Sequence, residues 1–359
     1  MKFLDEYRDS SAALKIAESI NGMVSRKWRI MEVCGGQTHS IVRFGINTML
    51  SESVDFLHGP GCPVCVTPAE RIDDAITLAC REEVIFCTFG DMMRVPGTSV
   101  DLMSARSRGA DVRIVYSPLE SLDIARQFPD KRVVFFGIGF ETTAPLIAAS
   151  ILQADARDCR NYHVLSSLRL IPPAIEMVLS AEDRPIDALL APGHVCTITG
   201  VEPYRVLSEK YGVPIVITGF EPVDILSGVK TAIGLLELSE NDVVNDYSRS
   251  VRLEGNTEAQ RIIDRVFESE NAEWRGLGSI SISGLKIRDE FLKFDAASEF
   301  GLSNAASADE KRNECIDVLM GRMKPEECSA FGSECSPDHP LGPLMVSSEG
   351  ACAAYYRYR

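Results

Sequence analysis

Short apolar runs rich in β-branched residues alternate with stretches of helical periodicity between residues 28 and 238. Parallel strands need long connections, usually helices, and those helices cover both faces of the sheet. The alternation therefore predicts an α/β architecture built from parallel βα units. The predicted strands are 28–33, 54–57, 84–87, 112–116, 133–136, 162–165, 188–190 and 214–217, and the predicted helices are 40–46, 69–79, 99–108, 119–128, 173–180 and 223–238.

The βα pattern starts a second pass near residue 132, which divides the α/β region at that point. We expect one α/β domain over residues 28–130 and a second over residues 131–238. Residues 239–312 are charged and less regular, with a helix predicted at 257–268 and a small strand at 279–283. Residues 1–27, which carry a helical stripe, are expected to join residues 239–359 in a smaller cysteine-rich domain.

Charge and hydropathy exclude several classes of partner. A formal net charge of -15 leaves no basic stripe to neutralise the phosphates of a nucleic acid or an anionic membrane. The first residues are acidic where a signal peptide needs an apolar run, and the apolar run at 144–152 is too short to span a bilayer. We therefore predict a cytoplasmic protein, whose eleven cysteines do not form a disulfide framework because that compartment keeps thiols reduced.

A Cys-x-x-Cys pair, Cys62 and Cys65, follows the second predicted strand in the stretch His58-Gly59-Pro60-Gly61-Cys62-Pro63-Val64-Cys65. Such a pair between a strand and a helix is typical of thioredoxin-like redox sites, where helix amides lower the thiol pKa. Half of a structural zinc site is the alternative. The chain has no second Cys-x-x-Cys pair, which favours redox chemistry.

The first predicted strand leads into Cys34-Gly35-Gly36-Gln37-Thr38-His39. Two glycines let the backbone turn sharply and approach a ligand closely. We predict that Thr38 caps the helix that follows and that Cys34, near its N-terminus, is a reactive thiolate. His39 is a candidate base or hydrogen-bond partner. The alternatives are a buried structural cysteine and a structural histidine.

Further glycine turns follow later strands, where parallel sheets gather their ligands. Gly137-Ile138-Gly139-Phe140-Glu141 resembles a dinucleotide fingerprint, but Thr142 replaces its third glycine, which disfavours a nucleotide site. Gly219-Phe220-Glu221 repeats Gly139-Phe140-Glu141 at a second strand end, predicted in the same sheet, and a packing phenylalanine with a helix-capping glutamate explains both. His194 lies in a third turn, Ala191-Pro192-Gly193-His194-Val195, with a structural histidine as the alternative.

Four cysteines crowd the C-terminal part of the chain: Cys315, Cys328, Cys335 and Cys352. Four thiolates without histidine suit an iron–sulfur cluster or a tetrahedral zinc ion. Zinc sites usually bring their ligands in close pairs, so spacings of 12, 6 and 16 intervening residues favour a [4Fe-4S] cluster. The segment is rich in turn residues and can build little core, so a cluster would stabilise its fold. Unligated cysteines in a packed tail are the alternative.

The stretches 34–39, 59–65, 137–145, 192–195 and 345–356 resemble, in chain order, the motifs of the HypD family of hydrogenase maturation factors. The resemblance covers essentially the whole chain. It implies two similar parallel-sheet βα domains around a cleft plus a smaller cysteine-rich iron–sulfur domain. It also implies a scaffold function, shared with the partner HypC, in assembling the Fe(CN)2CO unit of [NiFe]-hydrogenase. HypE would deliver the cyanide, and HypF would act upstream of HypE. The hydrogenase large subunit would be an indirect partner, through HypC.

The resemblance also implies residue roles. Cys34 would bind the assembling iron, and Cys62 and Cys65 would be the redox pair between the iron and the cluster. His39 and His194 would line the cleft, and Glu349 would lie beside the cluster. The cluster would be held by Cys315, Cys328, Cys335 and Cys352. Many relatives carry a cysteine where this chain has Leu344, and we expect that position to be dispensable because four tail cysteines remain.

The implied mechanism is chemically consistent, because cyanide and carbonyl need an electron-rich low-spin iron and a soft thiolate suits such an iron. Electrons for ligand assembly would pass through the dithiol and the cluster. A stand-alone iron–sulfur thiol–disulfide reductase and a nucleotide-binding module with a structural metal are the alternatives. Neither alternative explains three separate cysteine sites in one chain.

Overall fold

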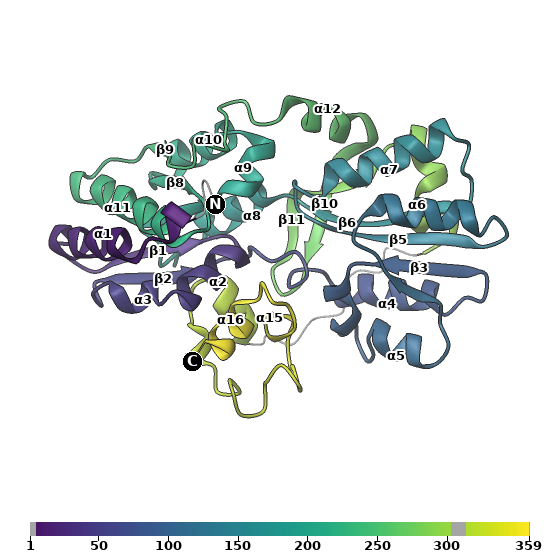
Figure 1. Cartoon of the computed structure of the whole chain (residues 1–359), viewed down its shortest axis with the longest axis horizontal. Helices are drawn as coiled ribbons and strands as arrows, with labels where there is room; N and C mark the ends of the chain where they lie inside the picture. The colour runs from purple at the N-terminus through teal and green to yellow at the C-terminus, as the bar shows by residue number, and fades with distance from the viewer. Residues whose placement is uncertain (1–4, 303–313, 359) are drawn as a thin grey trace. The chain divides into compact units, whose positions relative to one another are not determined.

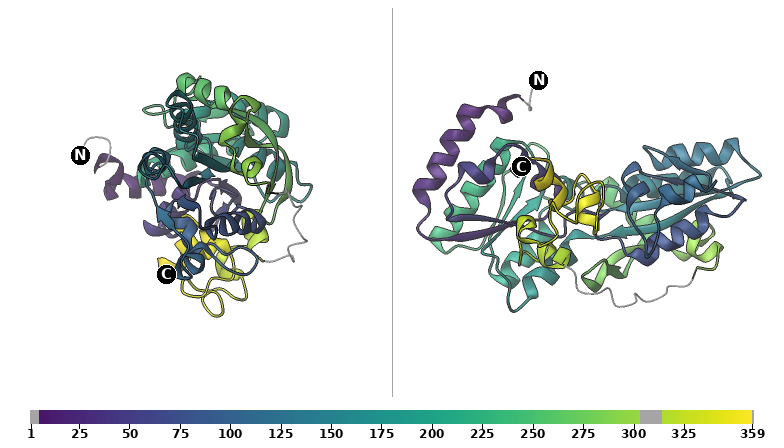
Figure 2. Two further views of the ribbon diagram at one scale, coloured as in Figure 1. Left: turned by 90° about the vertical axis from the view of Figure 1, so that its right-hand side faces the viewer. Right: turned by 90° about the horizontal axis from the view of Figure 1, so that it is seen from below.

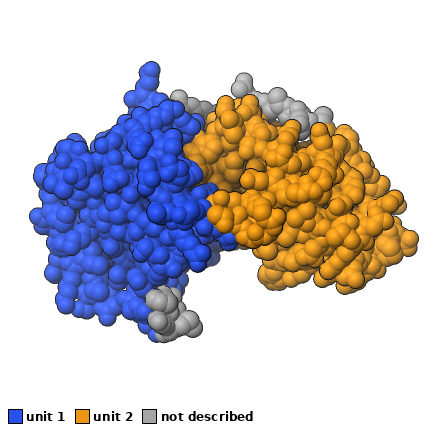
Figure 3. Space-filling model, turned by 90° about the horizontal axis from the view of Figure 1, so that it is seen from above, with its two compact units in different colours: residues 1–62, 174–256, 313–359 blue, residues 63–173, 257–312 orange. Residues whose placement is uncertain are grey.

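The computed structural model describes residues 5–302 and 314–358. The chain forms two compact units, coloured separately in Figure 3, and each is described by itself. Unit 1 comprises residues 1–62, 174–256 and 313–359, and unit 2 comprises residues 63–173 and 257–312. The chain therefore passes between the units four times. Each of the predicted α/β ranges, 28–130 and 131–238, is divided between the two units.

Unit 1 is built on a parallel five-stranded sheet with the order β2-β1-β7-β8-β9. Its central strands are buried on both faces, as expected for a parallel sheet covered by helices. The strands are β1 Trp28–Glu32, β2 Val54–His58, β7 Ala188–Pro192, β8 Ile215–Thr218 and β9 Val243–Asn245.

The helices of unit 1 bury apolar side chains against this sheet. In Figure 1, α1 and α11 lie side by side, and both contribute to one hydrophobic core that includes Ile20, Ile30, Val216 and Ile233. The helical segments are η1 Asp5–Arg8, α1 Ser10–Met23, α2 Gly35–Arg43, α3 Ile46–Met49, α9 Gly193–Thr199, α10 Glu202–Tyr211 and α11 Pro222–Leu238, with α14 Glu314–Leu319, η4 Pro325–Glu327, α15 Pro343–Val346 and α16 Ala351–Arg357 in the C-terminal part.

Unit 2 is built on a six-stranded sheet with the order β10-β11-β6-β5-β3-β4. Strands β3 to β6 are parallel, whereas β10 and β11 form an antiparallel hairpin added at the β6 edge. The strands are β3 Val84–Thr88, β4 Val112–Ile114, β5 Arg132–Gly139, β6 Tyr162–Arg169, β10 Phe267–Trp274 and β11 Gly278–Ile287. The helical segments are α4 Ala69–Ala79, η2 Gly90–Arg94, α5 Leu102–Ser107, α6 Pro118–Gln127, α7 Ala144–Ala156, α12 Thr257–Val266, η3 Asp289–Phe294 and α13 Ala296–Glu299, and α8 Ile171–Ser180 leads from unit 2 into unit 1.

The parallel βα units predicted from the alternation are confirmed. The helix predicted near 257–268 is confirmed as α12, which ends at Val266 because Phe267 and Trp274 bury their rings in strand β10, which pairs with β11. One detail of the prediction was wrong. The two Gly-Phe-Glu turns do not share a sheet, because β5 pairs within unit 2 and β8 within unit 1. Within residues 5–302 and 314–358, no helix combines the length and the apolar character needed to cross a membrane.

Candidate functional site

Three of the predicted turns meet at one edge of the unit 1 sheet. Strands β1, β7 and β8 are parallel neighbours, and their carboxyl ends lead to Cys34, His194 and Phe220. The Cys34 Sγ atom lies 3.7 Å from the His194 Nδ1 atom, and the His194 and Phe220 ring centroids are 5.3 Å apart. The amide of Gln37 donates to the carbonyls of Ala191 and Thr218, which ties α2 to the ends of β7 and β8. This edge is the candidate site.

Cys34 is a neutral thiol in this setting. Its side chain is 5% exposed, and burial raises its pKa strongly, with the carboxylates of Glu32 and Glu349 adding to that effect. Hydrogen bonds from the backbone N–H groups of Gln37 and Gly36 lower the pKa of Cys34, but by less than burial raises it. The prediction of a reactive thiolate was therefore wrong for the metal-free protein, because desolvation outweighs the helix N-terminus. A bound metal would displace the proton.

His194 is also uncharged at neutral pH. Burial lowers its pKa to about 4, so the Nδ1 atom that faces Cys34 is free of the charge that would repel a metal ion. Glycine is required just before it, because a Cβ atom on Gly193 would lie 2.5 Å from the Thr218 carbonyl oxygen. The neutral thiol and neutral imidazole together form a soft-donor and proton-acceptor pair.

The Glu32 carboxylate fixes the Cys34 turn through hydrogen bonds. Glu32 is 1% exposed at the end of strand β1, and its Oε2 atom accepts the Cys34 backbone N–H at 2.8 Å. Its Oε1 atom accepts the hydroxyl of Thr38 and contacts the His58 Nδ1 atom at 2.6 Å. Thr38 therefore does not cap a later helix, because α2 already begins at Gly35 with Cys34 as its N-cap. Sequence reasoning missed Glu32, although a charged residue inside a buried strand is the signal that could have found it.

The Cys62 turn packs directly on the Cys34 turn. The Gly35 N–H donates to the Gly61 carbonyl at 3.2 Å, and a Cβ atom on Gly61 would lie 2.3 Å from the Cys34 backbone nitrogen. Cys62 and Cys65 are disulfide-bonded, whereas the other nine cysteines form no disulfide. Both sulfurs are shielded, since Cys62 is 3% exposed and Cys65 is 0% exposed. The redox role of this pair stays a prediction.

The four C-terminal cysteines lie near one another. Cys352 is buried, and burial followed by the charges of Cys315, Cys328 and Cys335 raises its pKa. A Cβ atom on Gly342 would lie 2.5 Å from the Cys315 Sγ atom, so the loop at Gly342 passes close to this thiol. Among residues 5–302 and 314–358, no group of three or more His, Cys, Asp or Glu residues already has the geometry of a metal site. Four neighbouring soft donors nevertheless fit an iron–sulfur cluster in their chemistry.

The C-terminal residues 314–358, which we call the tail, pack on the helix that Cys34 caps. Figures 1 and 2 show α16, in yellow, beside α2. The Tyr358 hydroxyl is 2.9 Å from the His39 Nε2 atom, and a Cβ atom on Gly35 would lie 2.1 Å from the Glu349 carbonyl oxygen. His39 therefore contacts the tail, and burial with the charges of nearby arginines lowers its pKa. Leu344, 1% exposed in α15, is a packing residue of this tail.

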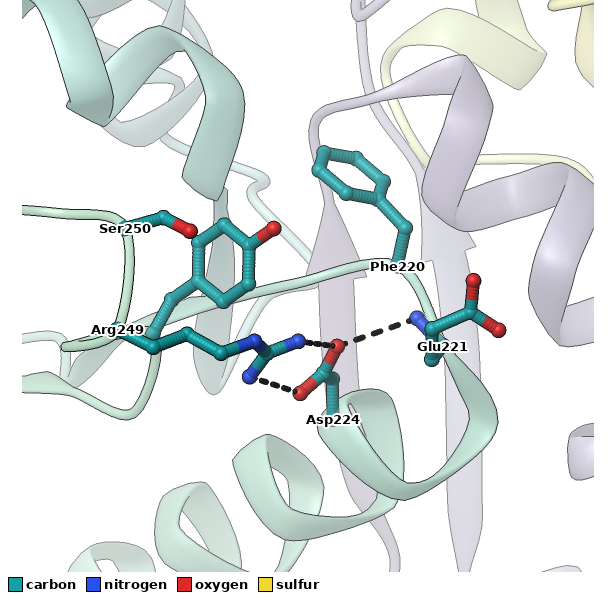
Figure 4. A pocket seen from close by; sticks show the side chains of 6 residues that line it. Phe220, Glu221, Asp224, Arg249 and Ser250 are labelled. Carbon is teal, nitrogen blue, oxygen red and sulfur yellow. Dashed lines mark hydrogen bonds and ion pairs between the residues drawn. The ribbon is translucent and has the colours of Figure 1, made fainter. Parts of the chain in front are cut away.

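Phe220 also lines a pocket of about 280 Å³ (Figure 4). Arg249 donates to both carboxylate oxygens of Asp224, at 2.7 and 2.6 Å, and this pairing raises the pKa of the guanidinium. The guanidinium also lies 3.8 Å from the Tyr7 ring centroid and 4.5 Å from that of Tyr247. The sequence around Arg249 does not indicate a site, because Asp224 and Tyr7, which contact Arg249, are distant from it in the chain. The pocket is lined by Phe220, Glu221, Asp224, Tyr247, Arg249 and Ser250.

The two Gly-Phe-Glu turns do pack and cap as predicted. Glu221 is the N-cap of α11 and forms a capping box with Asp224, while Phe140 stacks on Trp274 with centroids 6.0 Å apart. In unit 2, the Glu141 Oε1 atom accepts the N–H of Ile171, at the start of α8, at 2.9 Å. The Glu141 Oε2 atom has no hydrogen-bond partner among the described residues, and burial raises the pKa of this carboxyl to about 7.

Glu141→Gln is expected to stabilise the protein at pH 8 and to change little at pH 4.5. The folded carboxyl titrates near 7 and the unfolded one near 4.5, so the folded state binds more protons between these values and loses stability as pH rises. With about 1.4 kcal/mol for each pKa unit, the gain at pH 8 is on the order of 3 kcal/mol. Urea unfolding from pH 4.5 to 8 measures it, with the exposed Glu83→Gln as control. Parallel pH curves for wild type and Glu141→Gln would contradict the expectation.

The sequence is similar to one known family over nearly its whole length. The HypD family model, described as "Hydrogenase formation hypA family", matches residues 11–359. The chain is 45% identical to the hydrogenase maturation factor HypD of Escherichia coli strain K12, over 100% of this chain and 98% of that protein. It is 44% identical to the hydrogenase maturation factor HypD of Rhodobacter capsulatus, again over 100% and 98%. It is 45% identical to the hydrogenase expression/formation protein HupD of Azotobacter chroococcum mcd 1, over 100% and 97%. All the cysteines described above lie inside these matches.

Proposed function

The chain belongs to the HypD family of hydrogenase maturation factors, and from this premise we propose that it is, with HypC, the scaffold on which the Fe(CN)2CO unit of [NiFe]-hydrogenase is assembled. One observation carries the proposal. A buried thiol, Cys34, and a neutral imidazole, His194, face each other at 3.7 Å at the carboxyl edge of a parallel sheet. Such buried, water-poor surroundings would protect an iron whose ligands would be lost in solution.

Cys34 binds the incoming iron in this proposal. Its thiol is protonated in the metal-free protein, so binding releases one proton. The His194 Nδ1 atom at 3.7 Å is placed to pass this proton on but does not keep it, because its pKa is about 4. The thiolate then supplies the soft, electron-rich donor that a low-spin iron with cyanide and carbonyl ligands needs. Phe220 closes one side of the pocket through its contact with the His194 ring.

The dithiol of Cys62 and Cys65 provides reducing equivalents next to the iron site. Closing its disulfide releases two electrons and two protons, and the structure holds this pair in the disulfide form. Cys315, Cys328, Cys335 and Cys352 would hold a [4Fe-4S] cluster, which supplies single electrons when bound. His39 and Glu349 lie where the tail meets α2, between the residues proposed for the cluster and the Cys34 turn.

The partners follow from the family and are part of the proposal. HypC forms the stable complex, HypE donates cyanide with HypF upstream, and the hydrogenase large subunit receives the iron unit through HypC, all in the cytoplasm. The stand-alone thiol–disulfide reductase fits less well. Cys62 and Cys65 are 3% and 0% exposed, so a substrate disulfide cannot reach either sulfur without an opening of the turn.

Cys34→Ala is expected to abolish assembly of the iron unit. The measurement is the infrared spectrum of the protein co-purified with HypC without oxygen, because cyanide and carbonyl stretches fall where protein hardly absorbs. We expect these bands in the wild type and in Cys80→Ala, which removes an exposed thiol, and no bands in Cys34→Ala. Bands that persist without Cys34 would overturn its role. A wild-type complex that is loaded with iron but has no bands would favour the reductase.

A further inference from the structure

We propose that Tyr355 is a positioning residue for Cys34 and acts through His58 and Glu32. The inference rests on the proposed iron-binding role of Cys34 and adds a role for the C-terminal helix α16. Helix α16 carries Cys352 in its first turn. One of its side chains fixes the backbone of the thiol that receives the iron.

A continuous chain of hydrogen bonds joins Tyr355 to Cys34. The Tyr355 hydroxyl lies 2.9 Å from the His58 Nε2 atom, and the His58 Nδ1 atom lies 2.6 Å from the Glu32 Oε1 atom. A carboxylate oxygen accepts, so the His58 Nδ1–H donates to Glu32 and the Tyr355 O–H donates to Nε2. The other oxygen of Glu32 accepts the backbone N–H of Cys34 at 2.8 Å.

Burial keeps water away from this series of hydrogen bonds. Glu32 is 1% exposed, His58 is 3% exposed and Tyr355 is 6% exposed, so water cannot readily replace a missing partner. A buried carboxylate is tolerated only when it is well supplied with donors, and Glu32 has three of them: the Cys34 amide, the Thr38 hydroxyl and the His58 ring. Two of these donors belong to the turn and helix that begin at Cys34.

Other contacts of the tail end elsewhere. Tyr358 reaches the His39 ring, and the Glu349 backbone lies against Gly35, but only the Tyr355 chain ends on the amide of Cys34 itself among the hydrogen bonds of residues 314–358 described above. Loss of the Tyr355 hydroxyl leaves the His58 Nε2 atom buried without a donor, which favours a rotated ring and a weaker hold on Glu32. The expected consequence is a looser Cys34 turn in an otherwise intact fold.

The test compares Tyr355→Phe with Tyr356→Phe, which removes a hydroxyl from the next residue of the same helix. Alkylation rates of individual cysteines are measured by peptide mass spectrometry on the full-length protein purified without HypC. We expect Cys34 to react about fivefold faster in Tyr355→Phe, the effect of one buried hydrogen bond. Cys196, a fully buried thiol of the same unit, is the internal reference and should not change. Amide exchange at Cys34 should accelerate in parallel.

A purely structural role of Tyr355 would raise the Cys34 and Cys196 rates together, and that result overturns the proposal. An unchanged Cys34 rate overturns it as well. The infrared spectrum of the HypC complex separates this inference from the function beneath it. A shifted carbonyl band in Tyr355→Phe, with the wild-type band in Tyr356→Phe, supports both. Faster Cys34 labelling together with a wild-type complex that shows no bands supports the hydrogen-bond chain while the iron function fails.

Discussion

Gly61→Ala is expected to destabilise unit 1 by about 3 kcal/mol or more and to prevent iron retention at Cys34. A Cβ atom at this position would lie 2.3 Å from the Cys34 nitrogen, 2.4 Å from the Val33 carbonyl carbon and 2.5 Å from the Cys34 Cα atom. All three are backbone atoms, so no side chain can rotate away, and overpacking of this kind costs more than the usual core insertion. Urea unfolding followed by far-ultraviolet circular dichroism measures the loss.

Gly22→Ala is the matched control. Gly22 lies in α1 with nothing within 4 Å of the added carbon, so the same chemical change should stabilise the helix by about 0.5–1 kcal/mol. Opposite signs for the two variants would show that the close approach at Gly61 matters, and not the loss of a glycine. A Gly61→Ala protein as stable as the wild type would mean that the two cysteine turns do not pack as described.

Cys352→Ser is expected to remove the proposed [4Fe-4S] cluster almost completely. Cys352 is 6% exposed and the charges of the other three tail cysteines reach it, so it lies close to all of them and is the less exposed of the two buried members of the set, Cys335 and Cys352. Serine is nearly isosteric but is a hard donor, which an iron–sulfur cluster holds poorly. Iron and acid-labile sulfide content after anaerobic purification, with visible absorbance, measures the loss. The tail should also become more sensitive to proteases, because little core holds it.

Two further variants serve as comparisons for the Cys352→Ser experiment. Cys80→Ser removes an exposed thiol outside the tail and should keep full cluster content. Leu344→Cys adds a fifth cysteine to the tail, and we expect no gain in cluster content because Leu344 is 1% exposed and packs in α15. Higher cluster content in Leu344→Cys would mean that four cysteines are not sufficient. Full content in Cys352→Ser would remove Cys352 from the ligand set.

The local pattern of the sequence predicted much of this molecule. Hydrophobic periodicity and turn residues placed nearly all the parallel strands of the two sheets, because each signal depends on neighbours in the chain. The same reasoning placed Cys34 and His194 in turns at strand ends. Two neighbouring parallel strands then brought these residues together, since the carboxyl ends of such strands share an edge.

Long-range pairing and burial could not be predicted in the same way. No pattern of neighbouring residues indicates that β1 pairs with β7, or that the chain passes from helix α12 into strand β10 at Phe267. The pKa of Cys34 depends on desolvation by residues far along the chain, which reversed the expected effect of the helix N-terminus. The link from Glu32 to Tyr355 spans more than 300 residues and has no signature in the sequence beyond a charged residue at the end of a predicted strand.

The four passages of the chain between the units have a consequence for synthesis on the ribosome. Strands β1 and β2 emerge early, but β1 must wait for β7 before its second edge is paired, and Cys34 must wait for His194 on the same segment. At roughly 5–20 residues per second, this delay lasts many seconds. Tyr355 emerges later still. A nascent chain therefore carries Cys34 long before its surroundings exist, and only a chain translated through residue 355 can present a finished pocket to iron.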